Sequence, residues 1–204
     1  MCRVPPTGRA LLMRSPLPGA RGLMALLWAM AMALGGVGPA LADQQDERLE
    51  DLFARLQTTT SRAEAQVAQQ QIWQIWIEAD DSLANRLMRN GIEAMAARRN
   101  SLALQYFDQL VEEAPDFAEG WNKRATVHYL MDDYAASVLD IERTLELEPR
   151  HFGALSGLGM IYDAIGKPAA ALRSFEAAVA INPHLEGTRQ RIEALRRQLR
   201  GSQT

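Results

Sequence analysis

The stretch FAEGWNKRATVHYLMDDYAASVLDIERTLELEP, residues 117–149, decides the fold because its pattern recurs along the chain every 34 residues. Large apolar residues share one column of this register: Phe53, Leu87, Trp121 and Leu155. Another column ends each copy and reads Asp81, Pro115, Pro149 and Pro183. Small residues form a third column: Gly91, Ala125 and Gly159. A fixed period in several independent columns is typical of repeat architectures.

These columns resemble the tetratricopeptide repeat family, whose unit is a pair of antiparallel helices that stacks on its neighbours. Small residues such as Gly159 and Ala171 would let the two helices of a unit approach closely. Each proline would end the second helix, because proline cannot continue the backbone hydrogen-bond ladder. The resemblance implies an all-α fold, a right-handed solenoid of stacked helix hairpins with units at residues 84–117, 118–151 and 152–185.

The middle unit departs from the family pattern. Arg124 and His128 stand where a large apolar residue is usual, and Thr144 stands where a small one is. These departures have two interpretations: a local adaptation of the packing, or a surface reserved for a partner.

Helical patterns also flank the three units. Residues 43–83 resemble a degenerate helical hairpin, with Ser61 and Glu64 as a capping box, and we expect it to serve as the N-terminal cap of the solenoid. Residues 186–204 carry a narrow apolar stripe that includes Ile192 and Leu195 in an arginine-rich segment. We expect a capping helix there that covers the last unit and ends in a short tail.

Residues 1–42 have the order of a secretory signal peptide: a basic start, an apolar stretch, and the small residues Ala40 and Ala42. We expect cleavage after Ala42 and a periplasmic protein, since the export route suggested is bacterial. The alternative is an uncleaved anchor in the inner membrane, because the apolar stretch has about the ~20 residues of a membrane span. The only cysteine, Cys2, lies in this leader.

Composition and charge narrow the classes of partner. With 48% hydrophobic and 23% charged residues, the chain can form a sizeable core. The net charge is -3, and the leader holds four arginines and no acid, so residues 43–204 carry -3 minus 4, or -7. Nucleic acids bind clustered lysine and arginine, so we expect no nucleic-acid partner.

No set of residues points to catalysis or to a cofactor. His128, His151 and His184 do not share a helix face at the spacing of metal ligands. Gly157 and Gly159 fit the helix-packing column and follow no predicted strand, so they do not form a dinucleotide loop. The sequence predicts a protein that is not an enzyme and that has no metal or cofactor.

In the family, the concave face is lined mainly by the first helix of each pair, and adaptable Met and Tyr side chains suit a peptide groove. By register, that face would contain Asn85, Met88, Ile92, Met95, Asn122, Thr126, Tyr129, Ser156, Met160 and Asp163. The alternative for the methionines is that they only fill contacts between units.

The three tryptophans after the leader divide between core and surface. Trp121 and Trp73 share columns with large apolar residues and are expected in the core, whereas Trp76 falls outside them and is a candidate exposed anchor for a partner.

Two functions remain open from the sequence. The first is a periplasmic scaffold or adaptor that binds a protein or peptide along the concave face. The second is a structural subunit of an envelope complex that self-associates through its degenerate end or Trp76, with or without an uncleaved anchor in the membrane.

Overall fold

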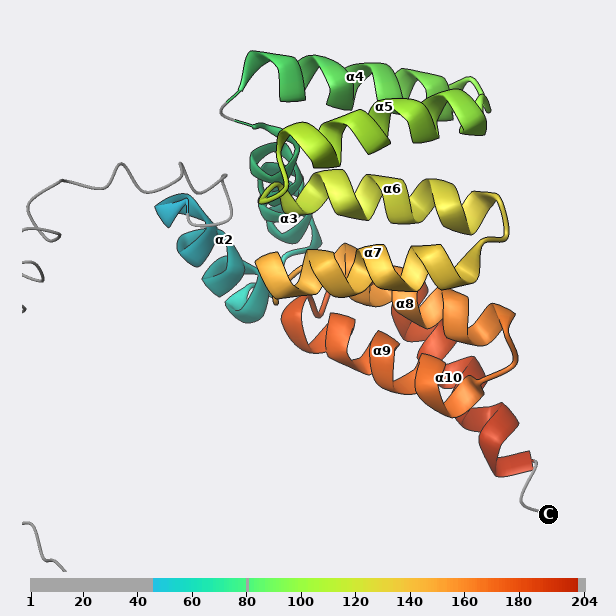
Figure 1. The fold of residues 1–204 in the computed structure, drawn as a ribbon. Coiled ribbons are helices and arrows are strands. Elements are labelled where there is room, and N and C mark those ends of the chain that lie inside the picture. The colour runs from blue at the N-terminus through green and yellow to red at the C-terminus, as the bar shows by residue number, and fades with distance from the viewer. Residues whose placement is uncertain (1–45, 80, 202–204) are drawn as a thin grey trace, which may run out of the picture. The chain divides into compact units, whose positions relative to one another are not determined.

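A computed structural model describes residues 46–79 and 81–201, so the predicted signal peptide at residues 1–42 lies outside the described residues. Every regular element of the described part is a helix, which confirms the all-α prediction (Figure 1). The helices are α2 (Glu47–Thr58), α3 (Arg62–Ile77), α4 (Ser82–Ala96), α5 (Asn100–Glu113), α6 (Ala118–Leu130), α7 (Tyr134–Leu147), α8 (Phe152–Ala164), α9 (Pro168–Ile181) and α10 (Glu186–Gly201). None of these described helices is both long and apolar enough to span a bilayer.

Three helix hairpins form the repeat array: α4 with α5, α6 with α7, and α8 with α9. Each hairpin packs on the next, through α5 against α6 and α7 against α8. Helix α10 lies on α9, and its Ile192 and Leu195 are buried beside Ala171 and Phe175. The arginine-rich segment therefore covers an apolar side of the α8–α9 hairpin.

In the α4–α5 and α8–α9 hairpins, the close approach of the two helices depends on glycine. A Cβ atom built on Gly159 would lie 2.6 Å from the ring of Phe175, and one on Gly91 would lie 2.4 Å from the ring of Phe107. Both rings are buried, so neither can move aside without disturbing the core. Gly91 and Gly159 thus leave the space that the rings of Phe107 and Phe175 occupy.

We predict that Gly159→Ala destabilises the protein by roughly 1–3 kcal/mol, because its methyl group overpacks the contact with Phe175. Gly187→Ala is the matched control: Gly187 is the second residue of α10 with open space around it, so alanine there should not destabilise the protein. Urea unfolding of both variants measures the difference. Equal stabilities would show that the α8–α9 contact does not need glycine.

The α2–α3 hairpin occupies a different place from the one expected. Its buried residues share a core with Phe152 of α8 and Ala178 of α9, and with no buried residue of α4 or α5. Helix α3 contacts α6, and α2 contacts α9. The hairpin therefore lies across the ends of the second and third units and does not stack on the first unit as an N-terminal cap (Figure 1).

Polar contacts hold the hairpin at this edge. The Gln57 side chain donates to the carbonyl oxygens of Ala180 and Ile181 at 2.8 and 2.6 Å. Arg150 pairs with Glu50 at 2.7 Å. The segment after α3 is extended, and its Ala79 N–H donates to Asn85 Oδ1 at 3.0 Å.

The tryptophans also differ from the sequence-based expectation. Trp76 is fully buried, so it cannot be an exposed anchor. Trp121, expected in the core, is only half-buried, with its indole N–H bonded to the Pro115 carbonyl at 3.0 Å. Trp73 is half-buried and borders a pocket. The 34-residue register misplaced Trp73 and Trp76 because the α2–α3 hairpin does not stack in line with the repeats. Trp121 belongs to a repeat helix and lies half-buried beneath the Arg124 guanidinium, 4.8 Å from its ring centre.

The departures in the middle unit are a local adaptation of the packing. Arg124 of α6 binds the buried Asp140 of α7 with bonds of 2.7 and 2.8 Å, and it reaches Asp108 of α5 at 3.1 Å. Its pKa is raised, first by the hydrogen bonds to Asp140. Thr144 is buried and donates to the Asp140 carbonyl at 2.8 Å. At position 124 an ion pair thus stands where the family pattern has an apolar residue, beside the apolar contact of Ala125 and Ile141.

Candidate partner-binding pocket

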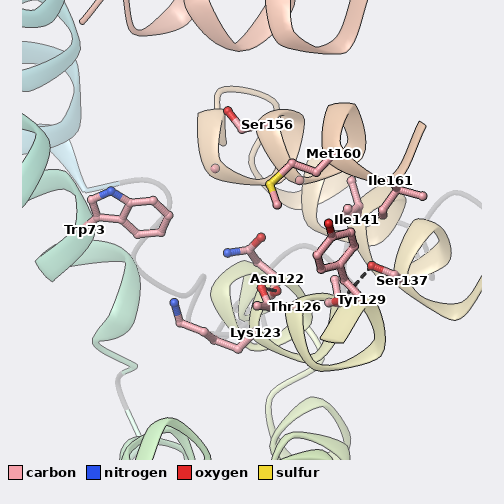
Figure 2. A pocket seen from close by; sticks show the side chains of 13 residues that line it. Trp73, Asn122, Lys123, Thr126, Tyr129, Ser137, Ile141, Ser156, Met160 and Ile161 are labelled. Atoms are coloured by element: carbon pink, nitrogen blue, oxygen red, sulfur yellow. Dashed lines mark hydrogen bonds between the residues drawn. The ribbon is translucent and has the colours of Figure 1, made fainter. Parts of the chain in front are cut away.

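A pocket of about 230 Å³ lies between α6 and α8, and we call it the central pocket (Figure 2). Five residues of the predicted groove line it: Asn122, Thr126, Tyr129, Ser156 and Met160. Helix α6 supplies the first three and α8 the other two. Trp73 of α3 faces them across the pocket.

The lining combines an apolar base with a polar rim. Ala125, Ile141, Gly157 and Ile161 form apolar surface, and Met160 is 46% exposed. Tyr129 and Ser156 contribute hydroxyl groups for which the described residues offer no hydrogen-bond partner. An apolar pocket with a few convergent polar groups is the usual form of a binding site.

The other five predicted residues lie elsewhere. Met88 is buried in the core of the first hairpin, so exposure in a groove was the wrong expectation for it, and Met95 packs against the same core. Asn85 bonds the segment before α4, and Asp163 pairs with Arg191 of α10. Ile92 is exposed on α4 outside the central pocket. The α4–α5 hairpin of the first repeat unit therefore contributes no lining residue.

A buried glutamate contacts two of the residues that line the pocket. Glu119 of α6 has no exposed surface, and its Oε2 accepts from Asn122 Nδ2 and contacts His151 Nε2, each at 2.8 Å. Its Oε1 lies 2.8 Å from the ammonium group of Lys123. A buried carboxylate needs such compensation, because leaving its charge unpaired in the interior is costly.

His151 links this glutamate to the N-terminal hairpin. Its Nδ1 accepts the backbone N–H of Ala154 at 3.0 Å and so caps the start of α8. Since Nδ1 accepts, the hydrogen of the imidazole is on Nε2 and is donated to Glu119. The ring also stacks on Trp76, with centroids 4.1 Å apart and an angle of 13°. One side chain therefore connects α3, α6 and α8.

Lys123 connects the same network to the pocket wall. Its ammonium nitrogen lies 5.4 Å from the centre of the Trp73 ring while it pairs with Glu119 (Figure 2). Gly153 at the start of α8 gives that ring its space, because a Cβ there would lie 2.5 Å from Trp73 Cη2. The position of Trp73 is thus fixed by both α6 and α8.

The charges around Glu119 set its protonation. Burial alone would raise its pKa, but Lys123 and the hydrogen bond from His151 outweigh burial, so the pKa of Glu119 lies below its ordinary value of 4.5. A carboxyl group with a lowered folded-state pKa stabilises the fold above the unfolded pKa, and this stabilisation is lost as the pH falls.

We predict that Glu119→Gln lowers the free energy of unfolding at about pH 7 by roughly 1.5–3 kcal/mol, since hydrogen bonds to a charged group are lost. The gap to the wild type should shrink as the pH falls below 4.5, where the wild type loses the same stabilisation. Urea unfolding between about pH 7 and pH 3 measures it. Glu112→Gln, at an exposed site on α5, is the control. A gap independent of pH would contradict the ionised form of Glu119.

The sequence did not indicate Trp73, Lys123 or Gly153 as lining residues. Trp73 was assigned to the core from a shared column, and the column presumed in-line stacking. The sequence does contain one signal for Lys123. It follows Glu119 by four residues, a spacing at which opposite charges pair on a helix. Among the described residues, no three histidine, cysteine or acidic side chains lie together in an arrangement that could hold a metal ion.

Comparison with known proteins identifies the family. The family model described as tetratricopeptide repeat matches residues 88–140 and 123–186. A TPR repeat-containing protein of Rhizobium etli is 34% identical over 158 residues, which cover 78% of each chain. This chain belongs to the tetratricopeptide repeat family. The aligned length exceeds that of the chain from α4 onward, so the likeness to this tetratricopeptide repeat protein includes residues of the α2–α3 hairpin.

Solved tetratricopeptide repeat structures share the fold. The TPR2B domain of yeast Sti1, in complex with pHsp70, has a TM-score of 0.54 and 18% identity over 58% of this chain and 99% of its own. The first TPR of Spaghetti, bound to the HSP90 peptide SRMEEVD, has a TM-score of 0.56 and 17% identity over 59% and 95%. At these identities the similarity concerns the fold alone.

Proposed function

We propose that this protein is an exported scaffold or adaptor that binds a segment of a protein partner in the central pocket. The observation that carries the proposal is the convergence of Trp73, Tyr129 and the exposed Met160 on one pocket between two first helices of the repeats. Aromatic and methionine side chains are enriched in protein interfaces. The two free hydroxyl groups suit the backbone of a bound segment.

Family membership supports this proposal. Tetratricopeptide repeat domains of similar fold were solved with an HSP90 peptide and with pHsp70. The net charge of -7 for residues 43–204 argues against a nucleic-acid partner. Self-association through Trp76 loses its support, because this side chain is buried against His151.

The binding proposal is tested with Met160→Glu, which adds a charge to the pocket at an exposed site. Partners captured from an envelope extract by the wild-type protein should be reduced at least tenfold, because a buried charge without a counterion opposes binding. Leu139→Glu is the matched control, since Leu139 is 66% exposed on α7 outside the pocket. Capture that survives Met160→Glu, or that is lost equally with Leu139→Glu, would contradict the pocket as the binding site.

Export is proposed from residues 1–42, with cleavage after Ala42; the alternative is an uncleaved anchor in the inner membrane. N-terminal sequencing of the protein from the periplasmic fraction should begin at Asp43. Protein that stays with the inner membrane and keeps the leader would support the anchor, and full-length protein in the cytoplasm would contradict both.

A further inference from the structure

The central pocket is not built by the repeats alone, and this feature leads beyond the proposed function while resting on it. Trp73 belongs to the α2–α3 hairpin, outside the three repeat units, yet its ring forms the wall opposite Met160 (Figure 2). We propose that this hairpin determines the specificity of the pocket, and that the completed pocket takes one large, uncharged apolar side chain from the partner.

The hairpin is held firmly enough to act as a wall. Its Trp76 is buried against His151, and Trp73 lies edge-on to His151 and to Phe152, with centroids 5.6 and 5.5 Å apart. Gly153 leaves the space that Trp73 occupies at the start of α8. A side chain fixed in this way loses little conformational freedom when a ligand packs against it.

The size of the pocket argues for a side chain as the occupant. Its volume of about 230 Å³ lies below the roughly 300–1,000 Å³ of sites that enclose whole small molecules. An indole, a phenol ring and a thioether surround the space, and these groups favour apolar contact. The hydroxyl groups of Tyr129 and Ser156 at the rim are available to the flanking peptide backbone.

The charges argue for an uncharged occupant. Among the described residues, Lys123 is the one cationic side chain that lines the pocket, and its ammonium group is 2.8 Å from the buried Glu119. An acidic ligand group would compete with Glu119 for this cation and leave the buried carboxylate less compensated. A basic ligand group would lie beside Lys123 and be repelled. An apolar side chain disturbs neither charge.

Defined peptides test the proposal. The probes are capped peptides Gly-Ser-Gly-X-Gly-Ser-Gly in which X is leucine, phenylalanine, lysine, glutamate or glycine. NMR titration of the full chain follows the methyl group of Met160 and the indole N–H of Trp73. Both signals should shift with the leucine and phenylalanine peptides, and binding should be at least tenfold weaker with the other three. Equal binding of the lysine or glutamate peptide, or no shift with any peptide, would overturn the apolar site.

The contribution of the hairpin is tested with Trp73→Leu, which keeps an apolar side chain against the core. Affinity for the phenylalanine peptide should fall at least tenfold, as for the loss of an interface tryptophan. Trp121→Leu is the matched control, because Trp121 is half-buried on α6 and does not line the pocket. Circular dichroism checks that both variants remain folded.

Gly153→Ala provides a second variant that keeps the indole but displaces it, and the same loss of affinity is expected. Unchanged affinity in both Trp73→Leu and Gly153→Ala would overturn the role of the hairpin. If Met160→Glu still abolished partner capture in that case, the proposed groove would stand without the hairpin. Loss in all three variants supports a pocket completed by Trp73.

Discussion

The buried contact between Glu119 and His151 is the interaction on which the arrangement around the pocket depends. Glu119 lies in α6, the first helix of the second repeat unit, and His151 caps α8, the first helix of the third, so their bond joins the first helices of two units. Two unpaired polar groups buried in this position would each carry a desolvation cost. Their pairing compensates for that cost. The other ring nitrogen of His151 caps the start of α8.

The same histidine explains why the N-terminal hairpin lies where it does. Trp76 stacks on its ring, and Phe152 continues the apolar surface on the other side. This surface lies at the start of α8, where a histidine and a phenylalanine are adjacent in the sequence. The start of α6 does not offer the same pair of residues. Phe117 and Ala118 stand there, 34 residues before His151 and Phe152.

The repeats could be predicted from the sequence because they depend on local residue types at a fixed spacing. Gly91 and Gly159 need only their own hairpin partner, Phe107 or Phe175, and both appear in the 34-residue columns. The place of the α2–α3 hairpin depends on contacts more than 70 residues away, such as Trp76 with His151, which no column records. The site followed the same division: Asn122, Tyr129 and Met160 were predicted by register, and Trp73 was not predicted as a lining residue.

In an array of repeats each unit contacts only its neighbours, so the angle between successive units is set by a single interface. The α2–α3 hairpin adds a second constraint, since α3 contacts α6 of the second unit while α2 contacts α9 of the third. Two units that are bridged by one hairpin as well as by their own interface have less freedom to open or close the space between α6 and α8. A pocket at that space is therefore organised before a ligand enters, and less of the binding free energy is lost to ordering. The departure of the hairpin from the repeat pattern is in this sense the feature that makes one space in a regular array different from the others.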